Sequence, residues 1–255
     1  MLHTNACYFL RPFRLVPNRS QKLEPYGSTA KWSFRPGVAA HSAMRFPGSG
    51  HRHIIPMTAH QRSRAPPIES VVIAGWPTSM KAPQRLQTQR LILRKPVATD
   101  AGQIYARYSS DTEVTRFLGW PRHLGIDDTH SFIDYSNVQW RECPAGPYLI
   151  ESRDGVLLGG TGLEFKGSDC ATTGYVLARA AWGLGFATEA LRAVIGVAQQ
   201  LNVRELYAIC HAEHTASQHV LAKCGFICSE RLFVNFPNLP AGESRMALRY
   251  ALALS

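Results

Sequence analysis

The sequence predicts a mixed α/β domain over residues 80–255, built around one mostly antiparallel β-sheet that is flanked by helices. Three observations support this fold class. Short apolar runs have the length of strands, other segments repeat apolar residues at helical spacing, and turns containing Gly or Pro separate them. Strands dominate after residue 148, so most of the sheet is expected to come from the second half of the domain.

Four local signals set the boundaries of the expected elements. Asp100 can cap a helix, with Gln103 three residues later. Asp154-Gly155 is typical of a hairpin turn, and Gly225 can close the last helix at its C′ position. The expected order is a strand at 90–95, helices at 100–108, 113–117 and 126–140, strands at 148–152, 156–165 and 172–177, a helix ending near 201, a strand at 205–211, a helix at 217–223, and strands at 226–234 and 245–252.

Residues 1–79 form a segment of another kind. They carry ten Lys/Arg and two acidic residues, against 18 and 16 in residues 80–255, and nine prolines interrupt them. We therefore expect a disordered basic extension. Three origins are open: a segment upstream of a natural start at Met80 (or Met57), a mitochondrial-type presequence, or a nucleic-acid-binding tail. The first is favoured, and nucleic acid is not expected as a partner.

The stretch at residues 179–190 is the strongest functional signal in the chain. Gly183, Gly185 and Ala187 alternate with larger residues where a helix must begin, so backbone N–H groups can face one anion at the positive end of the helix dipole. A tight turn whose glycines serve only packing is the alternative. A dinucleotide-binding Gly-x-Gly-x-x-Gly loop is disfavoured, because Thr188 stands where the third glycine belongs.

Other classes of site are disfavoured by composition and spacing. None of the six cysteines forms a C-x-x-C pair, and no secretory signal is visible, so reduced thiols in a cytoplasmic protein are expected. His211 and His214 flank Glu213 like metal ligands, but further ligands are missing and no metal is expected. The chain has no run of 18 apolar residues, so no membrane span is expected.

Three ordered blocks resemble the GNAT N-acetyltransferase superfamily, in its RimJ/RimL-like branch of ribosomal-protein N-terminal acetyltransferases. The likeness covers roughly residues 84–253. The blocks are Leu86-Gln-Thr-Gln-Arg-Leu-Ile-Leu-Arg94 with Asp100 shortly after, Gly174-Tyr-Val-Leu177 followed by Trp182-Gly-Leu-Gly-Phe-Ala-Thr-Glu-Ala190, and Thr215-Ala-Ser217 with Lys223-Cys-Gly-Phe226.

The resemblance implies a GNAT-type fold and acetyl-CoA as co-substrate, with a primary amine as acceptor, either a protein N-terminus or a small molecule. It implies that the pyrophosphate lies on the backbone amides of Trp182, Gly183, Leu184, Gly185, Phe186, Ala187 and Thr188. The pantetheine arm would add to Tyr175, Val176 and Leu177 like an extra strand, and His214, which replaces an asparagine of the superfamily, belongs to the same site. Arg179 either contributes charge to this site or is solvated. A monomer and a homodimer are both open.

The chemical step needs a base for the amine and a proton donor for the leaving thiolate. Ser217 matches the branch's pattern and is the candidate donor, although a plain helix-cap serine is an alternative. The chain departs from the superfamily at Thr172-Thr173, where a glutamate is common, and at Leu221, where a tyrosine is common. The base is left open among Glu164, Glu213 and His211. The rival function is a non-catalytic acyl-CoA-binding regulator.

Overall fold

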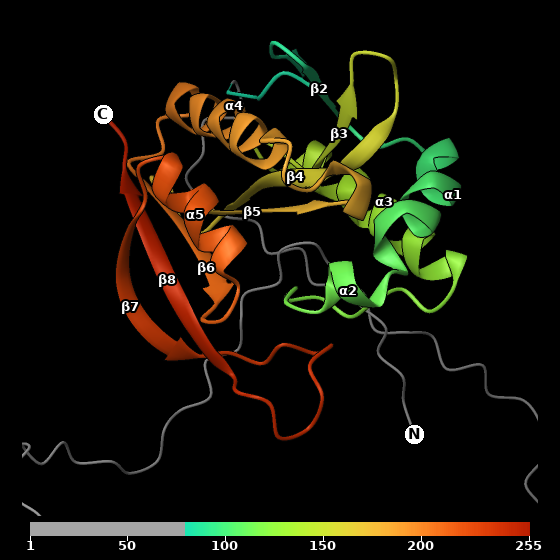
Figure 1. Cartoon of the computed structure of the whole chain (residues 1–255). Helices are drawn as coiled ribbons and strands as arrows, with labels where there is room; N and C mark the ends of the chain where they lie inside the picture. The colour runs from blue at the N-terminus through green and yellow to red at the C-terminus, as the bar shows by residue number, and fades with distance from the viewer. Residues whose placement is uncertain (1–79) are drawn as a thin grey trace, which may run out of the picture. The chain divides into compact units, whose positions relative to one another are not determined.

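The computed structural model describes residues 80–255, so the expected disordered extension at 1–79 lies outside the described residues. Within residues 80–255, eight strands form one sheet in the order β1-β2-β3-β4-β5-β6-β8-β7, in which only β5 and β6 run parallel (Figure 1). The predicted fold class is therefore confirmed. The strands are β1 (Arg85–Gln87), β2 (Leu91–Arg94), β3 (Tyr148–Ser152), β4 (Leu157–Phe165), β5 (Cys170–Leu177), β6 (Glu205–His211), β7 (Ile227–Phe233) and β8 (Met246–Ala253).

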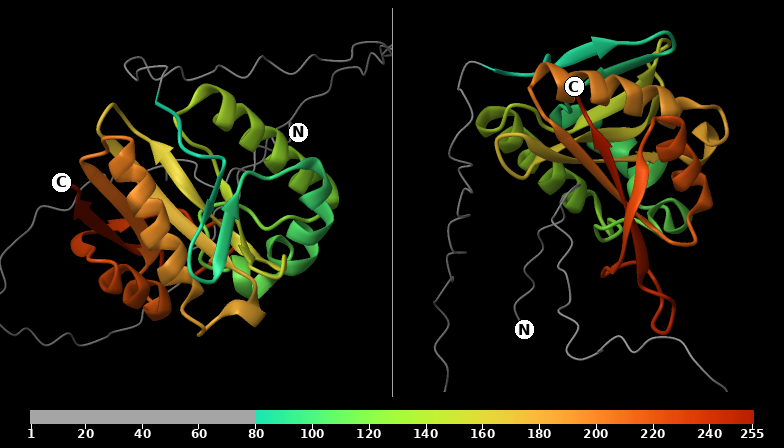
Figure 2. Two further views of the ribbon diagram at one scale, coloured as in Figure 1. Left: turned by 90° about the horizontal axis from the view of Figure 1, so that it is seen from above. Right: turned by 90° about the vertical axis from the view of Figure 1, so that its left-hand side faces the viewer.

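Helices cover both faces of the sheet (Figure 2). The longer ones lie on opposite sides: α3 (Ile126–Glu142) packs with α1 (Ala101–Ile104) over one face, and α4 (Phe186–Gln200) with α5 (Thr215–Lys223) over the other. The short α2 (Thr112–Thr115) follows α1. Single turns η1 (Ala98–Asp100), η2 (Tyr105–Ser109, a π-helical turn) and η3 (Arg179–Ala181) complete the set. Within residues 80–255, no helix is both long and apolar enough to cross a membrane.

The two faces carry separate hydrophobic clusters because side chains alternate along a strand. On β3, Leu149 packs with Ile104 and Phe132 beneath α1 and α3. Its neighbour Ile150 packs with Leu191 on the α4 side. All five side chains are at most 3% exposed, so the centre of the sheet is covered from both sides.

The capping expected at Asp100 is wrong in its geometry. Helical structure starts earlier, at Ala98, and the Asp100 side chain bonds no N–H of the following turn. Its carboxylate instead accepts a hydrogen bond from the Val97 N–H at 2.7 Å and two from the Arg94 guanidinium at 2.7 and 2.8 Å. Asp100 therefore joins the end of β2 to the first helical turn.

The predicted end of the last helix is confirmed. Gly225 follows α5 with φ +87°, a backbone conformation that favours glycine. Its N–H donates to Ala222 O at 3.0 Å, and the Phe226 N–H donates to Leu221 O at 3.1 Å. This pair of bonds is the Schellman motif, and it turns the chain from α5 directly into β7.

Candidate functional site

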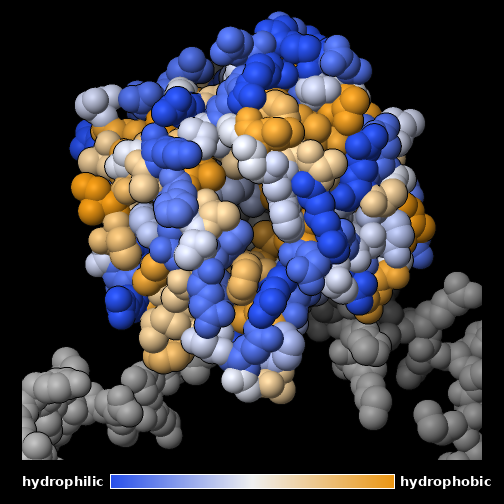
Figure 3. Space-filling model, viewed as in Figure 1, coloured by the Kyte–Doolittle hydropathy of each residue, from blue (hydrophilic) through white to orange (hydrophobic). Residues whose placement is uncertain are grey.

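Strands β5 and β6 diverge in the middle of the sheet. Their parallel pairing covers only three residue pairs, the last of which is Thr172 with Tyr207. A cavity of about 430 Å³ lies beyond this point, between Thr173 and Tyr175 on one side and Ile209 on the other. On the face shown in Figure 3, apolar residues lie in a hollow whose rim is mostly hydrophilic.

The backbone of β5 offers hydrogen-bonding groups to this opening. The Ala178 N–H donates to Leu158 O at 2.8 Å. Residues 174, 176 and 178 therefore direct their backbone N–H and C=O groups toward β4 in the antiparallel ladder. The alternate residues Tyr175 and Leu177 therefore direct their backbone groups toward β6, which has already diverged. Val176 differs from them, since its side chain is buried on the α1–α3 side.

The loop between β5 and α4 holds two glycines in the conformation that side chains disfavour. Gly183 has φ +73° and Gly185 has φ +80°, and α4 begins at the next residue, Phe186. The first N–H groups of a helix have no partner within the helix, so they converge here on a place suited to an anion. Trp182 and Leu184 are about half exposed on the same loop, at 49% and 54%.

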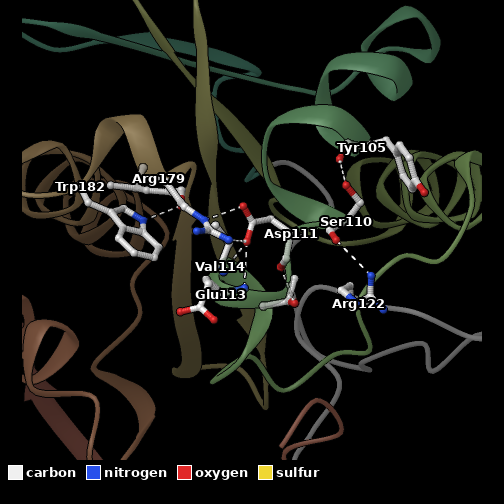
Figure 4. Close-up of polar contacts among 10 residues, drawn as sticks. Tyr105, Ser110, Asp111, Glu113, Val114, Arg122, Arg179 and Trp182 are labelled. Carbon is white, nitrogen blue, oxygen red and sulfur yellow. Dashed lines mark hydrogen bonds and ion pairs between the residues drawn. The ribbon is translucent and has the colours of Figure 1, made fainter.

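The indole of Trp182 joins this loop to the end of β5. Its Nε1–H donates to Leu177 O at 2.8 Å (Figure 4). That bond occupies the carbonyl of Leu177, so the groups of β5 that remain directed into the opening are the Leu177 N–H and the backbone of Tyr175.

A clasp around Glu189 holds the loop against the first block of the sequence. Glu189 Oε1 accepts from Thr88 Oγ1 at 2.6 Å and from the Arg90 N–H at 2.8 Å, while Arg90 Nε donates to Oε2 at 2.7 Å. Arg90 Nη1 also reaches Leu184 O at 2.9 Å. Burial disfavours the charged carboxylate, but these hydrogen bonds outweigh it and hold the pKa of Glu189 below its ordinary value.

The sequence contained Thr88, Arg90 and Glu189 inside the quoted blocks but gave them no role. The signal that could have found them is the pairing of a Thr-x-Arg turn with an acid in the first turn of a helix. Their separation of about 100 residues along the chain hides this contact from any local pattern.

Arg179 is exposed, and it has a partner that the sequence did not predict. Its guanidinium forms a two-pronged ion pair with Asp111, at 2.7 and 2.6 Å (Figure 4). Asp111 in turn caps α2, accepting the N–H groups of Glu113 and Val114. The hydrogen bond from Arg179 holds the pKa of Asp111 below its ordinary value. This pair therefore ties the start of the loop to α2, which lies beside the cavity.

Ser217 lies in the first turn of α5 and lines the cavity. Its hydroxyl is 3.0 Å from the phenol oxygen of Tyr175, which also donates to Ser217 O at 3.2 Å. Burial raises the pKa of Tyr175 well above its ordinary value, so the phenol keeps its proton. The N-cap of α5 is His214, which weakens the interpretation of Ser217 as a plain cap.

The two histidines near this helix have different surroundings. His211 is buried, with Nε2 2.8 Å from Ser244 O and Nδ1 accepting the Glu213 N–H at 3.2 Å. Both ring nitrogens are thus engaged, which leaves His211 none for a base. His214 lines the cavity beside Phe117, and burial, with His211 nearby, lowers its pKa, so its imidazole is neutral at pH 7.

Among the three candidates for the base, Glu164 lines the cavity. Its Oε1 is 2.7 Å from Lys166 Nζ, and its Oε2 accepts from Thr172 Oγ1 at 3.4 Å. Burial raises the pKa of Glu164, although the hydrogen bonds from Lys166 and Thr172 act in the opposite direction. Glu213, by contrast, is exposed on the loop before α5.

These features define an α/β domain suited to hold an extended ligand that carries a phosphate group beside a mostly apolar cavity that also presents polar side chains. The chain belongs to the acetyltransferase (GNAT) family, whose model, described as "Acetyltransferase (GNAT) domain", matches residues 90–227.

Known proteins with related sequences or folds agree with this assignment. The chain is 32% identical over 145 residues to "Uncharacterized N-acetyltransferase YoaA" of Bacillus subtilis (strain 168). This match covers 55% of this chain and 81% of that protein. The crystal structure of "Microcin C7 self immunity acetyltransferase MccE in complex with Acetyl-CoA and AMP" has a TM-score of 0.59 at 19% identity, over 69% of this chain and 99% of that one. "Mycobacterium smegmatis RimJ in complex with CoA-disulfide" has a TM-score of 0.56 at 22% identity, over 64% of this chain and 81% of that one. The two structural likenesses show the fold.

Proposed function

We propose that the domain transfers the acetyl group of acetyl-CoA to a primary amine held in the cavity between β5 and β6. The observation that carries this proposal is the arrangement of the opening itself. The start of α4, the backbone groups of Tyr175 and Leu177 that are not bonded to β4, and the hydroxyl of Ser217 lie around the opening between β5 and β6. N-acetyltransferases among the relatives support the same chemistry.

Each part of the opening has a share in binding the donor. The amides at 183–188 bind the pyrophosphate at the positive end of the α4 dipole, whereas the Trp182 N–H, which the sequence placed in the same set, already donates to Arg179 O at 3.0 Å. The backbone of Tyr175 and the Leu177 N–H bind the pantetheine arm as an added strand, while His214 borders the arm at the start of α5. Bound in this way, acetyl-CoA supplies an activated acetyl thioester next to Ser217.

Ser217 then donates its hydroxyl proton toward the departing thiolate sulfur. The phenol of Tyr175, 3.0 Å away, holds the Ser217 hydroxyl in place and keeps its own proton because it is buried. A contact of this kind strengthens as the C–S bond breaks, so it lowers the barrier more than it aids binding. Leu221, which stands where a tyrosine is common in the superfamily, lines the same cavity and carries no proton to donate.

The RimJ/RimL-like branch is the finer part of this proposal. The sequence blocks favour it, and the fold likeness to RimJ is compatible with it. A protein N-terminus and a small amine both satisfy the chemistry of the branch, so acceptor identity rests on the experiment below.

The test is to incubate the full chain with acetyl-CoA and pooled primary amines, and to measure free thiol and product mass. We expect thiol release that depends on the amine, with a product heavier by one acetyl group. Binding of acetyl-CoA without amine-dependent thiol release would contradict transfer and support the rival acyl-CoA-binding regulator. A chain that does not bind acetyl-CoA would contradict both.

A further inference from the structure

Building on the proposed acetyl transfer, we propose that Glu164 receives the ammonium group of the acceptor and takes its proton, and that the acceptor is a single amine on an apolar body. Glu164 and Ser217 line the same cavity from different elements, β4 and α5. A carboxylate and a hydroxyl that line one cavity can act on the two ends of the same transfer.

The geometry at Glu164 leaves its carboxylate directed toward the cavity. Glu164 pairs directly across the sheet with Thr172, so the two side chains lie on one face. Thr172 Oγ1 donates to one carboxylate oxygen and Lys166 Nζ to the other. Each carboxylate oxygen has more than one acceptor site, so an ammonium can join these partners without displacing them.

The walls of the cavity are mostly apolar. Phe117, Leu118 and Trp120 line it from the segment after α2, and Ile209 and Leu232 from the far strands. These five side chains bind an apolar body by excluding water.

The charges around the cavity balance one another. Besides Glu164 with Lys166, the lining includes Glu230, whose Oε2 is 3.3 Å from Arg249 Nη1. The other titratable groups of the lining are Tyr175, Tyr207, Cys170, Cys210 and His214. Burial raises the pKa of Cys170, Cys210 and Tyr175 and lowers that of His214, and the hydrogen bond to Glu205 raises that of Tyr207, so all five are neutral at pH 7. A second ammonium held against the apolar walls would lose its hydration without gaining a partner there, which disfavours polyamines.

Hydrogen bonds from Asn238 fix the wall of the cavity that contains Trp120. The side-chain amide of Asn238 donates to Thr115 O at 2.8 Å and to Trp120 O at 2.9 Å, and its oxygen accepts the Arg122 N–H at 2.8 Å. Asn238 lies between β7 and β8, so these bonds join the β7–β8 loop to the end of α2 and to the segment that follows it. A wall held by these hydrogen bonds cannot move without breaking them, so it favours acceptors whose shape fits the cavity.

The proton balance of the step is complete. Glu164 takes one proton from the acceptor ammonium, and the free amine forms the N–C bond as the C–S bond of the thioester breaks. Ser217 supplies the proton that the thiolate takes up, and the nitrogen, which must lose its second proton to become an amide, returns one to Ser217. One proton is released to solvent when Glu164 ionises again.

The substrate class is tested by comparing kcat/KM for 2-phenylethylamine, a tripeptide with N-terminal Phe, spermidine and ethanolamine. We expect one or both aromatic amines to exceed spermidine and ethanolamine by at least roughly tenfold, the value of one well-buried apolar group. The comparison of kcat/KM for 2-phenylethylamine and for the tripeptide shows whether the acceptor is a small molecule or a peptide N-terminus. Spermidine as the best acceptor would overturn the inference and leave the proposed function intact.

The role of Glu164 is tested by the pH profile of kcat/KM for the best acceptor. The kcat/KM of the parent should fall as pH falls through the pKa of Glu164, which gives the profile an acidic limb. The kcat/KM of Glu164→Gln should be lower by roughly 10²-fold or more and should show no acidic limb. Lys166→Met should keep the limb but move it to higher pH, because Lys166 stabilises the carboxylate. Glu142→Gln, the same change on the exposed end of α3, is the control and should match the parent.

Acetyl-CoA affinity and the melting temperature show whether each variant is folded. If the pH profile of kcat/KM were unchanged in folded Glu164→Gln, or if its acidic limb stayed at the parental pH in Lys166→Met, the inference would be wrong. The proposed acetyl transfer would still stand. If Glu164→Gln fails to fold, the shift in Lys166→Met still decides. No acetylated product from the parent with any amine would overturn the proposed function, and this inference with it.

Discussion

At the scale of single residues, the site depends on pairs that come from distant parts of the chain. The sequence predicted Ser217 from its place in a motif, but the phenol of Tyr175, 42 residues away, gives its hydroxyl a defined direction. Arg179 shows the opposite case, because its charge was visible in the sequence whereas its partner Asp111 was not. Residue types could therefore be predicted from local patterns, but their partners depend on the register of the sheet.

Ser217→Ala should lower kcat by roughly 10²-fold or more and leave acetyl-CoA affinity nearly unchanged, since the lost contact matters mainly as the C–S bond breaks. Steady-state kinetics and a thermal melt measure the two effects. Ser131→Ala, the same change at an exposed position on α3, is the matched control. If Ser217 only stabilised the start of the helix, the variant would instead lose about 1 kcal/mol of stability at near-parental kcat.

At the scale of elements, the expected strands and helices are present, with two exceptions that have physical reasons. The strand β1 was missed because it has three residues, only the middle one of which is partly buried, so it shows no apolar run. The start of the first helix was misplaced because an acid before a helix is usually a cap. Asp100 is instead held by Arg94, across a turn that the pattern of residues does not reveal.

Gly185→Val should weaken acetyl-CoA binding sharply. A β-branched residue at φ +80° is strained, and its Cβ would lie 3.4 Å from Arg90 Nη2, so the loop that presents the amides would have to shift. Titration calorimetry measures the affinity. Gly155→Val is the matched control, because Gly155 has φ +79° with open space around it in the β3–β4 turn. Parental affinity in a folded Gly185→Val protein would show that the loop is not the binding site.

Glu189→Gln should cost roughly 1–3 kcal/mol of stability, because the clasp to Thr88 and Arg90 loses a charged acceptor. The folded-state pKa of Glu189 is lowered from 4.5, so its contribution is complete above that pH and is lost as pH falls through the lowered value. Urea unfolding of parent and variant should therefore give a difference that shrinks below about pH 4.5. A difference that is independent of pH would mean that the carboxylate charge has no part in the clasp.

At the scale of the whole molecule, residues 80–255 account for a complete sheet with a hydrophobic cluster on each face. The sequence could predict this layered arrangement, since helical and strand periodicities were both visible. It could not predict where β5 and β6 separate, because Thr173 and Tyr175 resemble any other strand residues. The cavity arises from that separation, and so the candidate site was predicted by resemblance more than by local pattern.

Contacts at the start of the described segment bear on where the folding unit begins. The Ala82 N–H donates to Pro144 O at 2.8 Å, and Lys81 Nζ donates to Cys143 O at 2.7 Å. Leu91 and Leu93 of β2 are fully buried in the cluster beneath α4. The chain is thus attached to the sheet from residue 81 onward, and β2 is an integral part of the core.

A protein comprising residues 80–255 should therefore fold and bind acetyl-CoA like the full chain. Its melting temperature and its acetyl-CoA affinity are measured beside those of the full chain. A shorter protein, residues 96–255, is the control: it lacks Leu91, Leu93 and the Thr88–Arg90 side of the clasp, so we expect it not to fold. If the 80–255 protein failed to fold, or folded without binding acetyl-CoA, residues 1–79 would have to supply part of the core or of the site, and the expectation that they are dispensable would be wrong.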